Sequence, residues 1–316
     1  MLAKARFFLH FGLGLFFLYF VLTQNVLCQV VDELTETGRQ IAKNANIIPE
    51  MVPLIREKAD KGDAKAQYVL GWMYFTGQPV EKNNQQAVQW MTKAANQNFK
   101  FAQTQLGLMY LAAKDIPDNY ALAREWLTKG ADRREADALN ALGVIYSEGL
   151  GVKANGEEAT KYFRGAADGG FAMAQFNLGY QYYTGKLVPQ DYKEAAKLFK
   201  QAAQQDYVKA AYDLGVMYRD GQGVTQDSTE AIRLFQGVAE QHHLPTAEHN
   251  LGTIYYTGKG NVPQNLVLAY MWLSLAADGG YEHSKKLLPT VTERMSAEQI
   301  AEAKQKAQEW SKAHGS

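Results

Sequence analysis

The sequence predicts an all-α fold, an α-solenoid of helix-turn-helix repeats with a capping segment at each end. The first observation behind this prediction is the pattern Leu-Gly-x-x-Tyr, which recurs along the chain. Its glycines are Gly71, Gly107, Gly143, Gly179, Gly215 and Gly252. The second observation is their spacing, which is 36 residues four times and then 37. Self-similarity at a fixed period of this size indicates a repeat array.

The third observation is composition. The chain has 316 residues, of which 47% are hydrophobic and 21% charged, so it can bury a sizeable core and does not resemble a disordered chain. Its 33 basic and 33 acidic residues balance to a net charge of zero, and no run of five like charges occurs. A broad phosphate-binding or acidic-lipid surface is therefore not expected, and neither is a nucleic-acid partner.

Residues 1–28 have the layout of a secretory signal peptide: a short basic start, the apolar run Phe7–Leu22, and a polar exit. We expect cleavage after Cys28 and a periplasmic or secreted protein. One alternative is an uncleaved membrane anchor, although the apolar run is shorter than the roughly 20 residues that span a bilayer. A lipid-modified Cys28 is another alternative.

Cys28 is the only cysteine of the chain. If it leaves with the signal peptide, the mature protein has no disulfide, and its stability must come from core packing. A mature chain without cysteine also excludes a thiol enzyme and a zinc site built on cysteine.

Residues 29–63 are expected to form an N-terminal capping segment. A short helix is predicted over residues 51–60, and it should stop at the turn-like Lys61-Gly62-Asp63. The ends of a repeat array need such a segment, because the first repeat would otherwise expose its apolar side.

The first helix of each repeat in residues 64–281 is predicted from spacing around the motif glycine. An alanine five residues before it, a leucine one before it and a tyrosine three after it lie on one helical face. A second glycine follows six residues later and suits a helix C-terminus. It is present as Gly77, Gly149, Gly185, Gly221 and Gly258, and Ala113 replaces it in the second repeat.

The second helix of each repeat is predicted to begin after a side chain that caps free amides. These residues are Asn83, Asn119, Asn155, Asp191, Asp227 and Asn265. Gln86, Glu158, Glu194 and Glu230 stand at capping-box spacing after four of them. An alanine then recurs, and a large apolar residue follows it by three positions: Trp90, Trp126, Tyr162, Leu198, Leu234 and Trp272.

Residues 282–316 are expected to form the C-terminal capping helices. Pro289 replaces the motif glycine there, so we expect the array to stop at that residue, because proline removes an amide and clashes with the preceding turn. Ser296 and Gln299 should cap a final helix over residues 297–312.

The pattern A-x-A-x-x-x-L-G-x-x-Y-x-x-G-x-G-V, with a following Ala-Ala pair, resembles the Sel1-like repeat, a relative of the tetratricopeptide repeat. Ala172-x-Ala174…Leu178-Gly179…Tyr182…Gly185 and Ala202-Ala203 carry the match well. The repeats would be residues 64–99, 100–135, 136–171, 172–207, 208–244 and 245–281. The resemblance implies a right-handed α-solenoid, a monomer that acts as a protein-interaction scaffold. Bacterial members of the family are often exported and serve envelope biogenesis, signalling, motility or host contact.

An exported hydrolase of cell-wall peptides or β-lactams is one alternative function, and a glycan-binding element of polysaccharide export is another. Some exported members carry a cysteine pair in every repeat and have been described as penicillin-binding or β-lactam-hydrolysing. This chain lacks those cysteines, and it has no Ser-x-x-Lys, Lys-Thr-Gly, Gly-x-Ser-x-Gly or His-Glu-x-x-His motif. We therefore expect no enzyme and no cofactor.

Three histidines, His242, His243 and His249, lie close together where the fifth and sixth repeats meet. A metal site is one interpretation of this group. A solvated loop with one histidine on a helix surface is the other, and we expect that interpretation and no metal.

A partner site is predicted on the first-helix face opposite the alanine, leucine and tyrosine. Positions six and three before the motif glycine, and one and four after it, share that face, which lines the concave surface in tetratricopeptide-like arrays. The candidates are Tyr68, Trp72, Phe75, Phe101, Leu108, Phe176, Tyr180, Tyr183, Tyr212 and Tyr256. Exposed aromatic residues suit a protein or peptide partner, and they also stack on sugars, so a glycan is an alternative ligand. Packing between successive first helices is the other explanation for this set.

Overall fold

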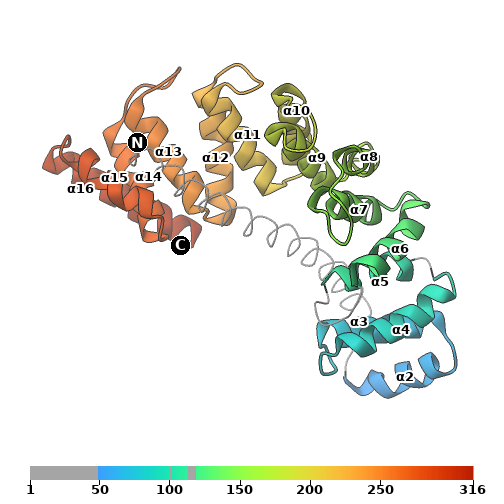
Figure 1. Cartoon of the computed structure of the whole chain (residues 1–316). Coiled ribbons are helices and arrows are strands. Elements are labelled where there is room, and N and C mark those ends of the chain that lie inside the picture. The colour runs from blue at the N-terminus through green and yellow to red at the C-terminus, as the bar shows by residue number, and fades with distance from the viewer. Residues whose placement is uncertain (1–48, 100, 113–118, 316) are drawn as a thin grey trace, which may run out of the picture. The chain divides into compact units, whose positions relative to one another are not determined.

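The computed structural model describes residues 49–99, 101–112 and 119–315, and every regular element among them is helical (Figure 1). The signal peptide expected at residues 1–28 and the exceptional Ala113 lie outside these residues. The chain divides into two compact units, Met1–Gly169 and Gly170–Ser316. No helix in the described part is both long and apolar enough to cross a membrane.

The first unit consists of helices that pack in sequential pairs. Its elements are η1 (Pro49–Met51), α2 (Val52–Asp60), α3 (Ala64–Thr76), α4 (Asn84–Asn96), α5 (Ala102–Ala112), α6 (Asn119–Ala131), α7 (Ala136–Glu148) and α8 (Gly156–Ala167). The pairs are α3 with α4, α5 with α6, and α7 with α8, and α2 packs on α3.

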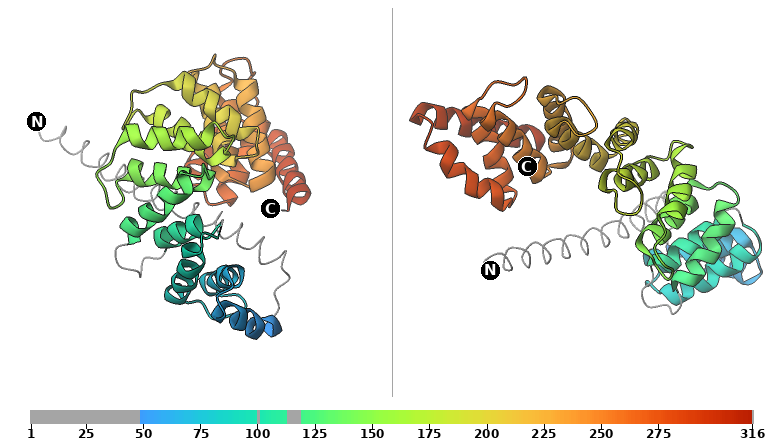
Figure 2. Two further views of the ribbon diagram at one scale, coloured as in Figure 1. Left: turned by 90° about the vertical axis from the view of Figure 1, so that its right-hand side faces the viewer. Right: turned by 45° about the horizontal axis from the view of Figure 1, so that its top comes forward.

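The second unit repeats this arrangement and adds the C-terminal helices. Its elements are α9 (Ala172–Thr184), α10 (Tyr192–Ala203), α11 (Val208–Asp220), α12 (Ser228–His242), α13 (Pro245–Thr257), α14 (Leu266–Asp278), α15 (Glu282–Thr292) and α16 (Ala297–His314). The pairs are α9 with α10, α11 with α12, and α13 with α14, while α15 and α16 both pack on α14. The two further views in Figure 2 also show the paired helices side by side. The all-helical solenoid of stacked helix pairs is thus confirmed.

The two helices of each pair approach each other closely at the motif glycine. A Cβ atom on Gly179 would lie 2.8 Å from the ring of Phe199, and one on Gly252 would lie 2.6 Å from Leu273 Cγ. The partners in the six pairs are Met91, Leu127, Phe163, Phe199, Phe235 and Leu273, and all are fully buried. We call them the plug residues. Glycine is needed at the motif position because the plug residue occupies the space of a side chain.

The predicted helix ends are largely confirmed. The glycine after five of the first helices adopts a left-handed conformation, with φ from 59° at Gly258 to 74° at Gly77. Side-chain caps are formed by Asn83, Asn155, Asp191, Asp227 and Asn265. Asn119 is the first residue of α6, and its side-chain oxygen accepts a hydrogen bond from the amide of Tyr120.

Glu158, Glu194 and Glu230, three of the residues at capping-box spacing, form ion pairs with the basic residue three positions further on, and the Glu230–Arg233 pair is 2.7 Å long. Opposite charges one turn apart on a helix stabilise it. The reciprocal capping box is formed at the start of α16 by Ser296 and Gln299, as predicted.

Pro289 does not end its own helix, although proline was expected to clash with the preceding turn. α15 contains Pro289 and continues to Thr292. Proline forfeits one backbone bond, but Val291 in the following turn is fully buried against Ala269 and Leu273, which anchors the end of the helix. α16 follows as the C-terminal cap, and its Trp310 packs on Trp272 with ring centroids 5.4 Å apart.

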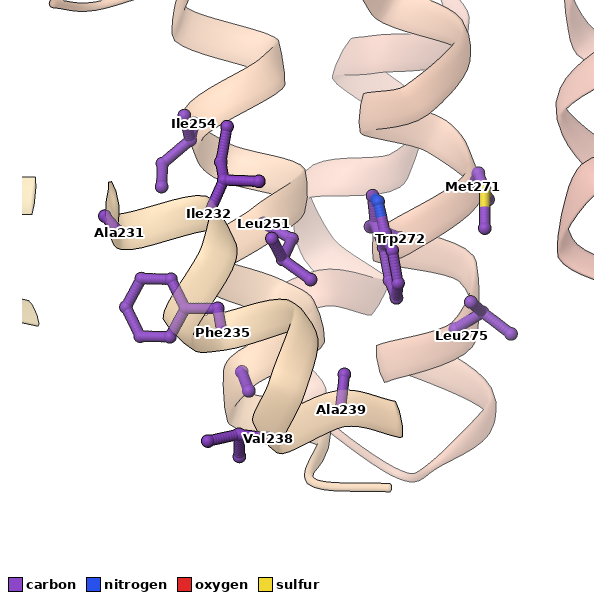
Figure 3. Packing of buried hydrophobic residues seen from close by; sticks show 11 residues of the cluster. Ala231, Ile232, Phe235, Val238, Ala239, Leu251, Ile254, Met271, Trp272 and Leu275 are labelled. Atoms are coloured by element: carbon purple, nitrogen blue, oxygen red, sulfur yellow. The ribbon is translucent and has the colours of Figure 1, made fainter. Parts of the chain in front are cut away.

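The core of the second unit lies between successive helix pairs. One cluster, drawn in Figure 3, joins α12, α13 and α14 through residues that include Phe235, Leu251 and Trp272. A second cluster joins α9, α10 and α11 through residues that include Phe199 and Leu214, and it takes in Leu234 from α12. Packing of this kind makes each repeat depend on its neighbours for stability.

Candidate functional site

Half of the predicted partner-binding residues are buried inside their own unit. Tyr68, Trp72, Phe75, Leu108 and Phe176 are between 1% and 7% exposed. Two of their rings contact neighbouring aromatic rings: the centroids of Tyr68 and Phe99 lie 5.2 Å apart, and those of Phe176 and Tyr207 also lie 5.2 Å apart. The exposure expected of these five is therefore wrong, and packing accounts for them.

The other five predicted residues reach the surface. Phe101 is 49% exposed. Tyr180, Tyr183, Tyr212 and Tyr256 are partly exposed, and all four lie in the second unit. A ring that is partly buried and partly solvated has a fixed orientation and a face or edge left for a ligand.

Two of these tyrosines belong to a polar cluster that extends over the first helices of the second unit. We call it the tyrosine–arginine cluster. Its members are Tyr183 from α9, Tyr212, Asp213 and Arg219 from α11, His249 and Asn250 from α13, and Tyr281 at the start of α15. Successive repeats therefore contribute to one continuous group.

Hydrogen bonds hold the centre of the cluster. Asn250 Nδ2 donates to the Tyr212 hydroxyl at 3.1 Å, and Arg219 Nη1 donates to Asn250 Oδ1. Arg219 also donates to both carboxylate oxygens of Asp220, at 2.7 and 2.6 Å. On the α9 side, the Tyr183 hydroxyl donates to Gln222 Oε1 at 3.1 Å. The guanidinium thus ties α11 to α13 while its charge is balanced by Asp220.

The acidic member of the cluster has a raised pKa. Burial raises the pKa of Asp213 to about 7, although Lys209 acts in the opposite direction. The pKa of the Tyr183 hydroxyl is also raised, first by burial and then by the charge of Asp213. Tyrosine hydroxyls both donate and accept hydrogen bonds, so this surface offers polar groups and aromatic rings to a ligand.

His249 forms a pair with Ser284 at the α15 end of the cluster. Its Nδ1 lies 2.8 Å from Ser284 Oγ, and its ring centroid lies 4.9 Å from that of Tyr281. Burial lowers the pKa of His249, and His283 and Arg219 lower it further. Ser284 is 0% exposed, so a substrate carbonyl has no path to its hydroxyl. A serine–histidine pair in this state supports packing rather than nucleophilic catalysis.

The three histidines considered for a metal are not brought together. His242 lies at the rim of a pocket between α10 and α12, and His243 contacts Trp310 with ring centroids 5.7 Å apart. His249 belongs to the tyrosine–arginine cluster. In the described part of the chain, no group of three His, Cys, Asp or Glu side chains could hold a metal ion.

Sequence reasoning found Tyr183 and Tyr212 and missed the polar members of the cluster. Arg219 stands four residues after Gly215, the same position that Phe75 and Tyr183 occupy in their repeats. A comparison of polar as well as aromatic residues at that position would have singled it out. Asp213 and Asn250 stand two residues before their motif glycines, a position that was not considered.

A family model described as the Sel1 repeat matches six segments of the chain, which together make up more than half of it. They are residues 64–99, 100–134, 136–171, 172–207, 208–243 and 245–281. A sel1-like repeat-containing protein of Acanthamoeba polyphaga mimivirus is 47% identical over 47 residues, 15% of this chain and 8% of that protein. The chain therefore spans less than a tenth of that relative's length.

Two crystal structures resemble the whole array. A Sel1 repeat protein from Oxalobacter formigenes has a TM-score of 0.61 and 29% sequence identity, with 93% of this chain and 90% of that chain covered. A protective antigen of uropathogenic Escherichia coli strains, described as displaying an SLR fold, has a TM-score of 0.51 and 22% identity. That comparison covers 89% of this chain and 68% of the antigen, and at this identity it shows the fold alone.

Proposed function

Because this chain belongs to the Sel1 repeat family, we propose that it is a non-catalytic protein-interaction scaffold of the bacterial envelope. In this proposal a peptide segment of a partner protein binds at the tyrosine–arginine cluster of the second unit. The observation that supports it best is the cluster itself, in which Arg219, Asn250 and Tyr212 join neighbouring first helices through hydrogen bonds.

The chemistry of the cluster suits a peptide. Tyrosine supplies a rigid apolar ring and a hydroxyl in one side chain, and tyrosine and arginine are enriched among residues that dominate binding energy. Tyr180 and Tyr256, both partly exposed, extend the same face along α9 and α13. Because the charge of Arg219 is balanced by Asp220, the site would select its partner by ring contacts and hydrogen bonds more than by net charge.

The envelope location rests on residues 1–28, which have the composition of a secretory signal peptide. The similarity to the Sel1 repeat protein from Oxalobacter formigenes, at 29% identity, supports a bacterial protein.

A crosslinking pull-down from an envelope fraction tests the proposal. The Tyr183→Ala/Tyr212→Ala variant should lose the partner that the wild-type protein retains. Tyr270→Ala is the matched control, since Tyr270 is a partly buried tyrosine on the second helix α14 and should leave the partner bound. Circular dichroism of each variant shows that the fold is intact. If the Tyr183→Ala/Tyr212→Ala variant retained the same partners as the Tyr270→Ala control, binding at the cluster would be contradicted.

The two other functions are tested on the same purified protein. Turnover of a chromogenic β-lactam well above an unrelated control protein would establish a hydrolase, which the full burial of Ser284 argues against. Retention on envelope polysaccharides, lost in the double variant and kept in the control, would replace the peptide with a glycan as the ligand.

A further inference from the structure

The tyrosine–arginine cluster extends over two junctions between neighbouring repeats, and the side chains of these junctions can be compared position by position. At the junction of the fifth and sixth repeats, Asn250 stands two residues before its motif glycine. It contacts Tyr212 and Arg219, which stand three residues before and four residues after the motif glycine of the preceding repeat. Asn250 therefore has both a hydroxyl and a guanidinium as hydrogen-bond partners.

The junction of the fourth and fifth repeats has different residues at the same three positions. They are Phe176, Tyr183 and Asp213. Phe176 has no polar side-chain atom, and the hydroxyl of Tyr183 donates its proton to Gln222 Oε1 at 3.1 Å. A carboxylate thus stands where the other junction has an amide, and a tyrosine stands where the other junction has the guanidinium. Neither of the two donors that Asn250 contacts has an equivalent that donates to Asp213.

The ionised form of Asp213 is disfavoured by its surroundings. Burial raises its pKa to about 7, and Lys209, one turn earlier on α11, acts against burial with the smaller effect. The guanidinium of Arg219 is directed to Asp220 and Asn250 instead. Part of the Asp213 side chain is exposed, so a group from outside the protein can reach it. A carboxylate in such surroundings gains most from a cation that also donates hydrogen bonds.

The tyrosines next to Asp213 suit the same kind of ligand. The pKa of the Tyr183 hydroxyl is raised by burial and then by the charge of Asp213, so this hydroxyl and the carboxylate lie close together. Tyr212 directly precedes Asp213 in the chain. Both tyrosines are partly exposed, and the face of a tyrosine ring attracts cations. An acid beside two tyrosines therefore complements an ammonium or guanidinium group.

We propose that Asp213 binds a lysine or arginine side chain of the partner peptide, and that Tyr183 and Tyr212 contact the same side chain. This inference rests on the function proposed above and adds to it one charged contact that selects the partner's sequence. The partner's cation would donate to Asp213 as Arg219 donates to Asn250 at the next junction. A neutral or acidic residue at that place of the peptide would leave the carboxylate desolvated and unpaired, which disfavours binding.

The test selects a random dodecapeptide library, displayed on phage, on the immobilised wild-type protein at pH 8, where Asp213 is largely ionised. We expect the selected peptides to lose binding to the Tyr183→Ala/Tyr212→Ala variant and to share a lysine or arginine at one position. A synthetic peptide of this set should bind Asp213→Asn about tenfold more weakly than wild type. Replacing its lysine by norleucine, or its arginine by citrulline, removes the charge and keeps the shape. This replacement should cause the same loss with wild type and no further loss with Asp213→Asn.

Two further variants separate the effect of charge from that of structure. Asp213→Glu keeps the charge and should retain most of the affinity, while Glu240→Gln removes one charge from the exposed surface of α12 and should leave the affinity unchanged. Peptides that depend on Tyr183 and Tyr212 but share no basic residue, or that bind Asp213→Asn as tightly as wild type, would overturn this inference and leave the proposed function standing. A library that yields no peptide lost by the double variant would contradict the proposed function and, with it, this inference.

Discussion

At the scale of single residues, two glycines of the second unit have opposite roles although both lie inside helices. The Cβ atom of an alanine at 215 would lie 2.8 Å from the ring of Phe235, which is 0% exposed and cannot move aside. The Cβ atom of an alanine at 237 would meet nothing within 4 Å. Gly215 is therefore required by packing, while Gly237 only lowers the helix propensity of α12.

Gly215→Ala should lower the free energy of unfolding by about 1 to 3 kcal/mol, because the added methyl group overpacks the contact with Phe235. Gly237→Ala should raise it by up to about 1 kcal/mol, because alanine is the better helix former. Urea unfolding followed by circular dichroism measures both. Equal effects of the two substitutions would show that the contact with Phe235 does not decide the role of Gly215.

The sequence predicted only one side of the contact between motif glycine and plug residue. The motif glycines were correctly assigned to the scaffold because they recur with the period. The plug residues were missed, since that position holds Met91, Leu127 or a phenylalanine and no single residue type marks it. The side chain that packs against the motif glycine belongs to the residue directly after Trp90 and its equivalents, which were the residues singled out from the sequence.

At the scale of helices, short-range signals determine where each element begins and ends. Asn155 accepts bonds from the amides of Glu157 and Glu158, at 3.0 and 3.2 Å, and so starts α8. Such caps depend only on nearby residues, which is why the sequence predicts them well. Pro289 was misjudged for the opposite reason: burial of Val291 by α14, a tertiary contact, keeps α15 helical beyond it.

Asn155→Ala should lower the free energy of unfolding by about 1 kcal/mol, because two amides at the start of α8 lose their acceptor. Asn155→Asp keeps an acceptor oxygen at the same place and serves as the control, with little loss expected. Thermal unfolding of the three proteins provides the comparison. A loss in the aspartate variant as large as that in the alanine variant would contradict a capping role.

At the scale of the whole molecule, two buried acids make stability depend on pH. Burial raises the pKa of Glu248 to about 7, with a further contribution from Asp278, and burial raises that of Asp213 to about 7. In the unfolded chain these groups titrate near pH 4. Between about pH 4 and pH 7 the folded state therefore holds more protons than the unfolded state, so stability falls as pH rises through this range and levels off above it.

The Asp213→Asn/Glu248→Gln variant should remove this decline. Relative to wild type, it should gain about 2 kcal/mol or more at pH 8 and change little at pH 4, since each unit of pKa shift corresponds to about 1.4 kcal/mol. Urea midpoints at pH 4, 6 and 8 measure the effect, with the exposed Glu240→Gln as control. A constant difference between the variant and wild type at all three values would show that the two acids do not cause the decline.

The sequence predicts the helices of this molecule better than it predicts which of their faces reach solvent. The period of the motif was enough to predict the helix pairs and their order. The exposure expected of the partner face holds for half of its residues, since the same positions are buried at Tyr68 and Phe176 and partly exposed at Tyr183 and Tyr212. Periodicity assigns a residue to a face of its helix, but packing by neighbouring helices decides whether that face reaches solvent.

The contact between motif glycine and plug residue also bears on how such an array can grow. Both halves of the contact, for example Gly179 and Phe199, lie within one period of 36 residues. A duplication of one such segment of the gene therefore copies a matched pair in a single event, with no second mutation needed to restore the fit. The number of repeats can therefore change by duplication of whole repeats. Residues outside the contact, such as Leu234 and Gly237, remain free to diverge in each copy.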